Sequence, residues 1–263
     1  MKTALTIAGF DPTGGAGVLQ DLKVMHYFGV YAISVITALT AQNTYEIKDI
    51  KPIEGKFVEE QLFTILSDIK PDALKTGMLF SRDAVKVVAK VIKGFELDNL
   101  VIDPVTVSST GTSLTEDGTL DVIMSELLPL CRVVTPNIYE ASVLSGIRIQ
   151  DMEDIHRAAE NILKYGSETV IITGFNLTDN KKVDESSDEI IDLLYDRKKF
   201  RYFGGRRISG EYHGTGCALS SAITALLARG ASIEEAIGRA KDFMSFTIEN
   251  AYALGKGMRL LNI

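Results

Sequence analysis

The chain has 263 residues, of which 46% are hydrophobic and 24% are charged. This length and composition allow one large α/β domain with a buried core, or at most two small ones. The net charge is −7 and the basic residues are scattered, so the sequence argues against nucleic acid and anionic membranes as partners. No apolar run is long enough to cross a membrane or to form a signal peptide, which predicts a cytoplasmic protein.

Strand-like and helix-like segments alternate along most of the chain. Segment 3–8 is an apolar run that predicts a buried strand, and 16–28 predicts a helix with Leu19 and Leu22 on its inner face. Further strands are expected at 30–37, 73–76, 100–102, 132–135 and 169–173. Helices are expected between them at 57–69, 82–93, 117–128, 137–145 and 151–165. This alternation predicts a mostly parallel sheet with helices on both faces.

The segment 188–203 breaks the alternation, because two apolar runs flank a charged turn as in a β-hairpin. It predicts a short antiparallel edge to the sheet. The last helix is expected to start at Ser232, with Glu235 completing a capping box. The polar stretch 176–188 is the best candidate for a mobile loop. No composition shift marks a linker, so a single domain over residues 1–263 is predicted.

The most informative motif is His213-Gly214-Thr215-Gly216-Cys217, which opens an apolar helix that ends before Gly230. The first turn of a helix has unpaired N–H groups and a partial positive charge, and glycines let a phosphate approach them closely. The same field is expected to lower the pKa of Cys217, which makes the thiol a candidate base or nucleophile. The alternative is an ordinary loop and helix cap.

Polar residues follow the ends of several predicted strands, and the carboxyl ends of parallel strands are where open α/β sheets bind ligands. The residues are Gly9, Asp11, Asp103, Asn137, Thr173 and Gly174. Taken singly, Asp103 with Pro104 can be a turn, and Asn137 with Glu140 can be a helix cap and its return partner. Taken together, they predict a binding rim that the 213–217 turn can join.

Several ordered motifs carry a resemblance to a known family. They are GFDPTGGAG (9–17), TALTAQNT (37–44), KTGM (75–78), DPV (103–105), TPN (135–137), HGTGC (213–217) and GKG (255–257). The chain resembles the hydroxymethylpyrimidine/phosphomethylpyrimidine kinases of thiamine biosynthesis, which are ribokinase-like and close to the pyridoxal kinases of the same type. The resemblance implies a ribokinase-like three-layer α/β/α sandwich with a mostly parallel central sheet and a short antiparallel edge.

The resemblance also implies roles for individual residues. The heterocyclic substrate is expected among Gly9, Asp11, Ala16, Asp21, Gln42, Met78 and Val105. The amide of Gln42 would hydrogen-bond the ring edge, because an amide both donates and accepts. For Met78 and Val105, ordinary core packing is the alternative.

The phosphoryl donor implied by the resemblance is ATP, with Mg²⁺ as its metal; a monovalent cation is left open. The nucleotide would contact Asn137, Glu140, Thr173 and Lys256, and the metal would lie near Asp103 and Glu140. The catalytic residues would be Gly214, Thr215, Gly216 and Cys217. The backbone N–H groups would hold the transferred phosphoryl group, and Cys217 would act as base or orient the hydroxyl. Many ribokinase relatives have an aspartate at the position of Cys217.

Three departures from the family pattern leave the substrate open. Thr173-Gly174-Phe175 stands where these kinases usually have Lys-Gly-Gly, Ser109-Thr110-Gly111 replaces Lys-Ser-Gly, and Met258-Arg259 follows the terminal glycines. The expected activity is phosphorylation of 4-amino-5-hydroxymethyl-2-methylpyrimidine and of its monophosphate. Pyridoxal or pyridoxine is the alternative substrate, and a non-catalytic ligand-binding regulator is the alternative class. A homodimer is the expected assembly.

Overall fold

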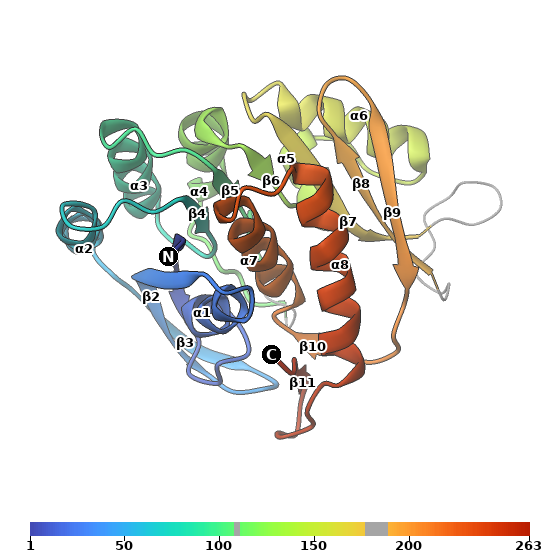
Figure 1. Ribbon diagram of the computed structural model, residues 1–263, viewed down its shortest axis with the longest axis horizontal. Helices are drawn as coiled ribbons and strands as arrows, with labels where there is room; N and C mark the ends of the chain where they lie inside the picture. Colours follow the sequence, from blue (N-terminus) through green and yellow to red (C-terminus); the bar gives the residue numbers. More distant parts are fainter. Residues whose placement is uncertain (108–110, 177–188) are drawn as a thin grey trace.

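The computed structural model of the protein describes residues 1–107, 111–176 and 189–263. Six strands lie side by side in parallel: β2 (Tyr31–Gln42), β1 (Thr3–Phe10), β4 (Ala73–Thr76), β5 (Leu100–Ile102), β6 (Val133–Val134) and β7 (Thr169–Phe175). Antiparallel strands extend both edges: β3 (Ile47–Pro52) beside β2, and β8 (Glu189–Tyr195) then β9 (Phe200–Arg206) beyond β7. The described residues thus form a nine-stranded sheet in the order β3-β2-β1-β4-β5-β6-β7-β8-β9 (Figure 1).

Helices cover both faces of the sheet (Figure 1). One face carries α1 (Gly17–Tyr27), α7 (Thr215–Ala228) and α8 (Ile233–Glu249). The other carries α2 (Gly55–Leu66), α3 (Arg82–Gly94), α4 (Thr119–Val122), α5 (Ile138–Ser145) and α6 (Met152–Leu163). The predicted three-layer α/β/α sandwich is therefore confirmed.

The burial pattern explains the layers. The inner residues of β1 and all of β4 are buried, as expected of central parallel strands with a helix layer on each side. Helix α7 is buried from Ala218 to Ala228, because it packs against α1 on one side and α8 on the other while it lies on the sheet. A helix that is apolar all round belongs in such a buried position. The turn at its start is thus attached to the most extensively buried helix of that face.

Two parts of the fold differ from the sequence prediction. The edge strand β3 was not predicted, because Lys48, Asp49 and Lys51 make its sequence polar and its side chains are largely exposed. The helix expected at 117–128 is instead the short α4, a π-helical turn at Ile123–Leu127 and a 3-10 turn at Leu128–Leu130. Pro129 lacks a backbone N–H and cannot continue a regular helix.

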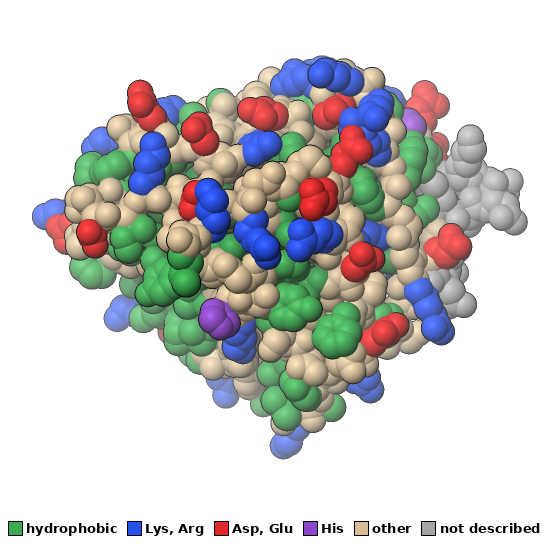
Figure 2. Space-filling model, in the orientation of Figure 1, with side chains coloured by type: hydrophobic (Ala, Val, Ile, Leu, Met, Phe, Trp, Pro, Cys, Tyr) green, Lys and Arg blue, Asp and Glu red, His purple; other side chains and the backbone are tan. Residues whose placement is uncertain are grey.

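The remaining predicted elements are present, with β1 and β2 longer than expected. Ser232 caps α8 by accepting a hydrogen bond from the N–H of Glu235, as predicted. Most of the expected mobile loop, residues 177–188, lies outside the described residues. Within the described ranges, no helix has the length and apolar character needed to cross a membrane. On the face shown in Figure 2, acidic and basic side chains of the described residues are interspersed.

Candidate active site

A cavity of about 640 Å³ lies at the carboxyl ends of the parallel strands. It brings together most of the residues predicted from the sequence: Gly9, Asp11, Ala16, Gln42, Met78, Asp103, Val105, Asn137, Glu140, Thr173, Gly214, Thr215, Gly216 and Cys217. These residues come from seven separate segments of the chain, so the parallel topology alone explains how they meet. We call this space the first cavity.

Two predicted residues do not line the first cavity. Asp21 is fully buried on α1, and its carboxylate contacts Lys75 and Ser221. Lys256 is exposed in a C-terminal loop, where the N–H of Gly257 donates to Thr44 Oγ1 at 3.1 Å. Direct contacts of Asp21 with the substrate and of Lys256 with the nucleotide therefore stay predictions.

The turn at the start of α7 depends on glycine. Gly214 has φ of +74°, and a side chain there would collide with the backbone carbonyl of Gly15. The amide of Gln20 donates to the Gly214 carbonyl at 2.6 Å and fixes the turn from α1. The first intrahelical bond comes from Ala218 to Gly214. Helical geometry therefore leaves the N–H groups of residues 215–217 available to an anion.

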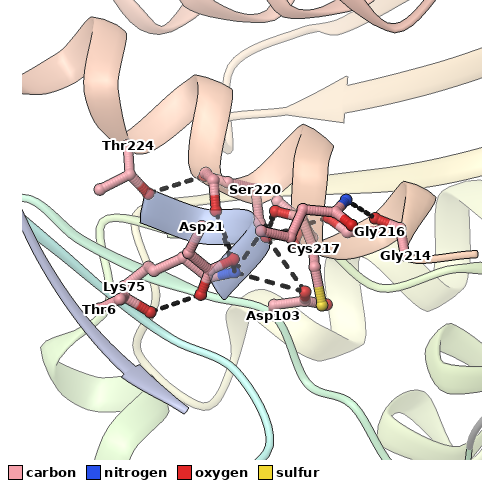
Figure 3. A network of polar contacts seen from close by, with 12 residues as sticks. Thr6, Asp21, Lys75, Asp103, Gly214, Gly216, Cys217, Ser220 and Thr224 are labelled. Carbon is pink, nitrogen blue, oxygen red and sulfur yellow. Dashed lines mark hydrogen bonds and ion pairs between the residues drawn. The ribbon is translucent and has the colours of Figure 1, made fainter. Parts of the chain in front are cut away.

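A buried charged network, which sequence reasoning missed, lies beneath this turn (Figure 3). Nζ of Lys75 lies 2.9 Å from Asp21 Oδ1 and 3.9 Å from Asp103 Oδ2, and it also contacts the Cys217 carbonyl at 3.4 Å. Burial lowers the pKa of Lys75, but its acidic neighbours Asp21, Cys217 and Asp103 together outweigh burial, and the pKa is raised. Lys75 therefore keeps its charge and links β4 to the first turn of α7. The KTGM motif contained this lysine, but only the fold shows its partners.

The prediction of a lowered pKa for Cys217 is wrong for the protein without ligands. Burial raises the pKa of this thiol to about 12, in spite of the nearby Lys75 ammonium, and the carboxylate of Asp103 raises it further. Loss of solvent and the negative charges of Asp103 and Asp21 all raise this pKa, and the positive field of the helix N-terminus does not offset them. The thiol also interacts with the carboxylate of Asp103. It is therefore protonated at neutral pH. Burial also raises the pKa of the second cysteine, Cys131.

Asn137 and Glu140 form the helix cap that the sequence left as an alternative reading. Asn137 Oδ1 accepts from the N–H of Glu140 at 2.9 Å, and Glu140 Oε2 accepts from the N–H of Asn137 at 3.0 Å. Burial raises the pKa of Glu140 to about 8, and the negative charge of Asp103 adds to the shift. Two carboxylates that disfavour each other's charge suit a cation between them.

These groups fit Mg²⁺ in chemistry, because the ion prefers oxygen ligands and keeps several waters. The capping box occupies Oε2 of Glu140, and the backbone of Thr106 also hydrogen-bonds this carboxylate. Among the described residues, no group of three or more His, Cys, Asp and Glu side chains forms a ready metal cluster. A metal here would therefore depend on water and on phosphate oxygens as well as on Asp103 and Glu140.

His213 is a site residue that sequence reasoning did not assign. Its Nε2 lies 2.6 Å from Asp11 Oδ2 and 3.1 Å from the side-chain amide of Gln42. The small sheet of β10 (Tyr212–His213) and β11 (Arg259–Leu260) places the ring, and Gly15 leaves room for it. Its position at the head of the HGTGC motif was the only sequence signal.

A second cavity, also of about 640 Å³, adjoins the first. Thr173, Thr215 and Gly216 line both, so the two cavities meet at the start of α7. In the second cavity Lys241 Nζ lies 2.8 Å from Asp192 Oδ2, and Asp192 Oδ1 accepts from the N–H of Gly174 at 2.8 Å. Sequence reasoning did not find Lys241 or Asp192, because no motif joins α8 to the antiparallel edge.

Comparison with known proteins agrees with this geometry. The family model described as phosphomethylpyrimidine kinase matches residues 11–262. A hydroxymethylpyrimidine/phosphomethylpyrimidine kinase of Aquifex aeolicus is 37% identical over 260 residues, which cover 98% of this chain and 99% of that protein. A thiamine biosynthesis bifunctional protein of Geobacter sulfurreducens is 39% identical over 97% of this chain, which spans only 51% of that longer protein.

A solved structure shows the same fold with ligands. The pyridoxal kinase of Staphylococcus aureus, in complex with AMP-PCP and pyridoxal, has a TM-score of 0.88 and 33% identity, with 100% of this chain and 93% of that chain covered. Its likeness supports the ribokinase-like arrangement of the sheet and helices. With the family match over nearly the full length, the conclusion is that this chain belongs to the phosphomethylpyrimidine kinase family.

Proposed function

We propose that the protein transfers the γ-phosphoryl group of ATP to 4-amino-5-hydroxymethyl-2-methylpyrimidine, and then phosphorylates the monophosphate to the diphosphate. The observation that carries this proposal is the junction of two cavities at the N-terminus of α7. A phosphotransferase must hold two substrates with the transferred group between them, and helix N-terminal amides stabilise the charge at that point. The names of the relatives supply the substrate class.

The first cavity is assigned to the heterocycle. Met78, Val105 and Leu114 give it apolar walls, and the amide of Gln42 provides one polar group among them. A flat ring with a few hydrogen-bonding atoms matches such a lining. The hydroxymethyl group would then face Gly214 to Cys217 at the far side of the same cavity.

The second cavity is assigned to the nucleotide. It shares the start of α7 with the first cavity and contains the Lys241–Asp192 ion pair. The related pyridoxal kinase carries an ATP analogue together with its vitamin substrate, which supports the use of two adjoining sites. Mg²⁺ held near Asp103 and Glu140 would neutralise phosphate charge.

At the transfer step, the N–H groups of residues 215–217 hold the charge that spreads over the phosphoryl oxygens. Because the pKa of the Cys217 thiol is raised to about 12, we assign this side chain to orient the substrate hydroxyl. A neutral thiol accepts and donates weak hydrogen bonds but takes up no proton. This assignment keeps the hydroxyl-orienting role predicted for Cys217 and sets aside the thiolate base.

Pyridoxal is the second candidate substrate. The related Staphylococcus aureus enzyme, which is 33% identical to this chain, is a pyridoxal kinase with pyridoxal bound. The experiment is ADP release with purified protein, Mg·ATP, and four substrates: the aminopyrimidine, its monophosphate, pyridoxal and pyridoxine. We expect turnover of both pyrimidines, with a higher kcat/KM than for either B6 vitamer. Turnover of the B6 vitamers without the pyrimidines would replace the proposal with a pyridoxal kinase.

A further inference from the structure

The side-chain amide of Gln42 has a protein partner at each end. Its Oε1 accepts a hydrogen bond from the Thr40 hydroxyl at 3.1 Å, and its Nε2 lies 3.1 Å from Nε2 of His213. A half-turn about the last side-chain bond exchanges the oxygen and the nitrogen without moving any other group. The order in which the amide presents its acceptor and its donor is therefore set by what Thr40 and His213 require.

His213 has a fixed requirement because of Asp11. Asp11 Oδ2 lies 2.6 Å from the same Nε2, and two lone pairs at that distance would repel, so a proton lies between them. The carboxylate also accepts from the N–H of Thr13 at 2.8 Å and from its hydroxyl at 2.9 Å. A group that receives three hydrogen bonds acts as an acceptor, which places the proton on Nε2 of His213.

The other ring nitrogen gives a second, independent reason. Nδ1 of His213 is buried and has no hydrogen-bond partner among the described residues. An N–H group buried without a partner is rarer and more costly than a bare acceptor nitrogen. Nδ1 is therefore the nitrogen without a proton, and the ring is the tautomer that carries hydrogen on Nε2.

We propose that Asp11 and His213 are positioning residues that hold the Gln42 amide in one order. This order is a half-turn from the one in which Oε1 accepts from Thr40 and Nε2 faces His213. The carbonyl oxygen then faces the imidazole, and the NH₂ group donates to Thr40, whose own hydroxyl donates to the Phe10 carbonyl at 3.1 Å. In this order every donor in the hydrogen-bonded series faces an acceptor; the series runs through Phe10, Thr40, Gln42, His213 and Asp11. Each end of the amide keeps one further hydrogen-bonding position for a ligand in the first cavity.

This fixed order selects how the substrate ring docks, an inference that rests on the proposed function. In the aminopyrimidine, the amino group and a ring nitrogen are neighbours, and they match an acceptor beside a donor. The hydroxymethyl group is on the carbon next to the amino-bearing carbon. If the amide turned over, the ring would turn with it, and the hydroxymethyl group would leave the side of Gly214 to Cys217. Pyridoxal has no amino group beside its ring nitrogen and escapes this constraint.

The test is Asp11→Asn, which preserves the size of the side chain. It replaces the acceptor Oδ2, which faces His213, with an NH₂ donor. The N–H of Thr13 donates to Asp11 Oδ1, so the asparagine carbonyl takes that position and its NH₂ group faces His213. The imidazole must then accept at Nε2 and carry its proton on Nδ1, which favours the opposite order of the Gln42 amide. We expect kcat for the aminopyrimidine to fall by roughly 10-fold or more, with KM changed less than about 3-fold.

The controls separate positioning from general damage. Asp98→Asn changes an exposed aspartate before β5, at the opposite end of the sheet, and should leave both constants unchanged. Any turnover of pyridoxal should fall less than about 3-fold in Asp11→Asn. An equal fall for both ring types would show a merely structural role and would overturn the proposal.

A direct readout comes from ¹⁵N NMR of the imidazole rings in the whole protein. The chain has three histidines, so His213→Asn assigns the His213 signals by their loss. We expect the Nε2–H tautomer in the wild-type protein and the Nδ1–H tautomer in Asp11→Asn. An Nδ1–H tautomer in the wild type would overturn the proposal. Failure of the wild type to phosphorylate any pyrimidine would overturn the proposed function, while the tautomer measurement would still decide the state of His213.

Discussion

The two cavities at the start of α7 are equal in size but differ in chemistry. In the first, the neutral amide of Gln42 lies within a hydrogen-bonded series and the carboxylates of Asp103 and Glu140 also line the cavity, whereas the second contains a partly buried ion pair, Lys241–Asp192. The first cavity is therefore suited to recognise the shape and hydrogen-bonding order of an uncharged ring. The second is suited to a charged ligand. On the proposed assignment of one ligand to each cavity, variants away from the shared start of α7 should affect heterocycle binding and nucleotide binding separately.

The largest expected loss of activity comes from damage to the turn at the start of α7, which both cavities share. Such a variant should impair the use of both substrates. Gly214→Ala should lower kcat/KM for both substrates by on the order of 10²–10³, since the added methyl group forces the turn off the Gly15 carbonyl. The control is Gly230→Ala at the other end of α7. Gly230 has φ of +87° but no atom near the added methyl group. Equal loss in both variants would mean that backbone strain alone explains the effect.

Glu140→Gln should sharpen the comparison because Glu140 lines the first cavity but is proposed to act on Mg·ATP. It should raise KM for Mg·ATP while heterocycle binding is retained, because the glutamine carbonyl can still accept the Asn137 N–H but brings no charge to a metal. A calorimetric titration of the protein with each ligand measures the two effects. Equal weakening of both ligands would point to the helix cap as the whole role of Glu140.

The same variant should change stability with pH. In the folded protein the pKa of Glu140 is raised from 4.5 to about 8. The contribution of the protonated side chain to the free energy of unfolding is therefore complete below pH 4.5 and is lost as the pH rises through 8. Glu140→Gln should match the wild type at pH 5 and exceed it at pH 9 by roughly 3–5 kcal/mol. Urea unfolding at both pH values measures this, with exposed Glu160→Gln as control. Parallel pH profiles of the wild type and Glu140→Gln would contradict it.

Cys217→Ser tests the heterocycle side near the reacting hydroxyl. Since burial raises the pKa of the thiol to about 12, a serine should keep the orienting role, and kcat should fall by about 10-fold or less. The same pKa predicts that a thiol-alkylating reagent reacts with Cys217 at pH 7 at least ~10-fold more slowly than with a free cysteine. Rapid alkylation, together with a 10²-fold or greater loss of kcat in the serine variant, would restore the thiolate base.

The smallest effects should come from one variant in each cavity. Gln42→Ala should raise KM for the heterocycle by roughly 2–10-fold and leave KM for ATP unchanged, as expected for one neutral hydrogen bond. Lys241→Met should do the reverse, because it removes the positive member of the Lys241–Asp192 pair. Steady-state kinetics with each substrate varied in turn measures both. If either variant raised both KM values equally, the assignment of one ligand to each cavity would be wrong.

The sequence predicted the central sheet well because its strands are short apolar runs followed by glycine, aspartate or asparagine. It also predicted most residues of the first cavity, since strand ends in a parallel sheet must meet at one rim. It missed β3, whose polar residues carry no apolar signal. The pKa of Cys217 could not be predicted, because it depends first on burial in the folded protein and then on Lys75 and Asp103, which are far away in the sequence.

The second cavity could not be found from the sequence for a related reason. Its ion pair joins Asp192 on β8 to Lys241 on α8, and neither residue lies in a recognisable motif. Similarly, the contact between His213 and Asp11 spans 202 residues. Local patterns predict elements, whereas contacts of this kind depend on how the elements pack.

The fully buried ion pair of Lys75 and Asp21 has a consequence for the order of folding. These side chains come from β4 and α1, and Ser221 of α7 completes their surroundings with a hydrogen bond of 2.7 Å to Asp21. A buried charge without its partner costs several kcal/mol, so the N-terminal strands cannot close stably around Lys75 until the pair is made. The pair itself can form early, but its remaining hydrogen bonds to the Cys217 carbonyl and Ser221, and its cover from solvent, come from α7, which is synthesised late. We therefore expect the N-terminal half to stay loosely packed on the ribosome until α7 docks. The step that completes the core would then also create the phosphate-binding turn, so that partly folded chains have no active site.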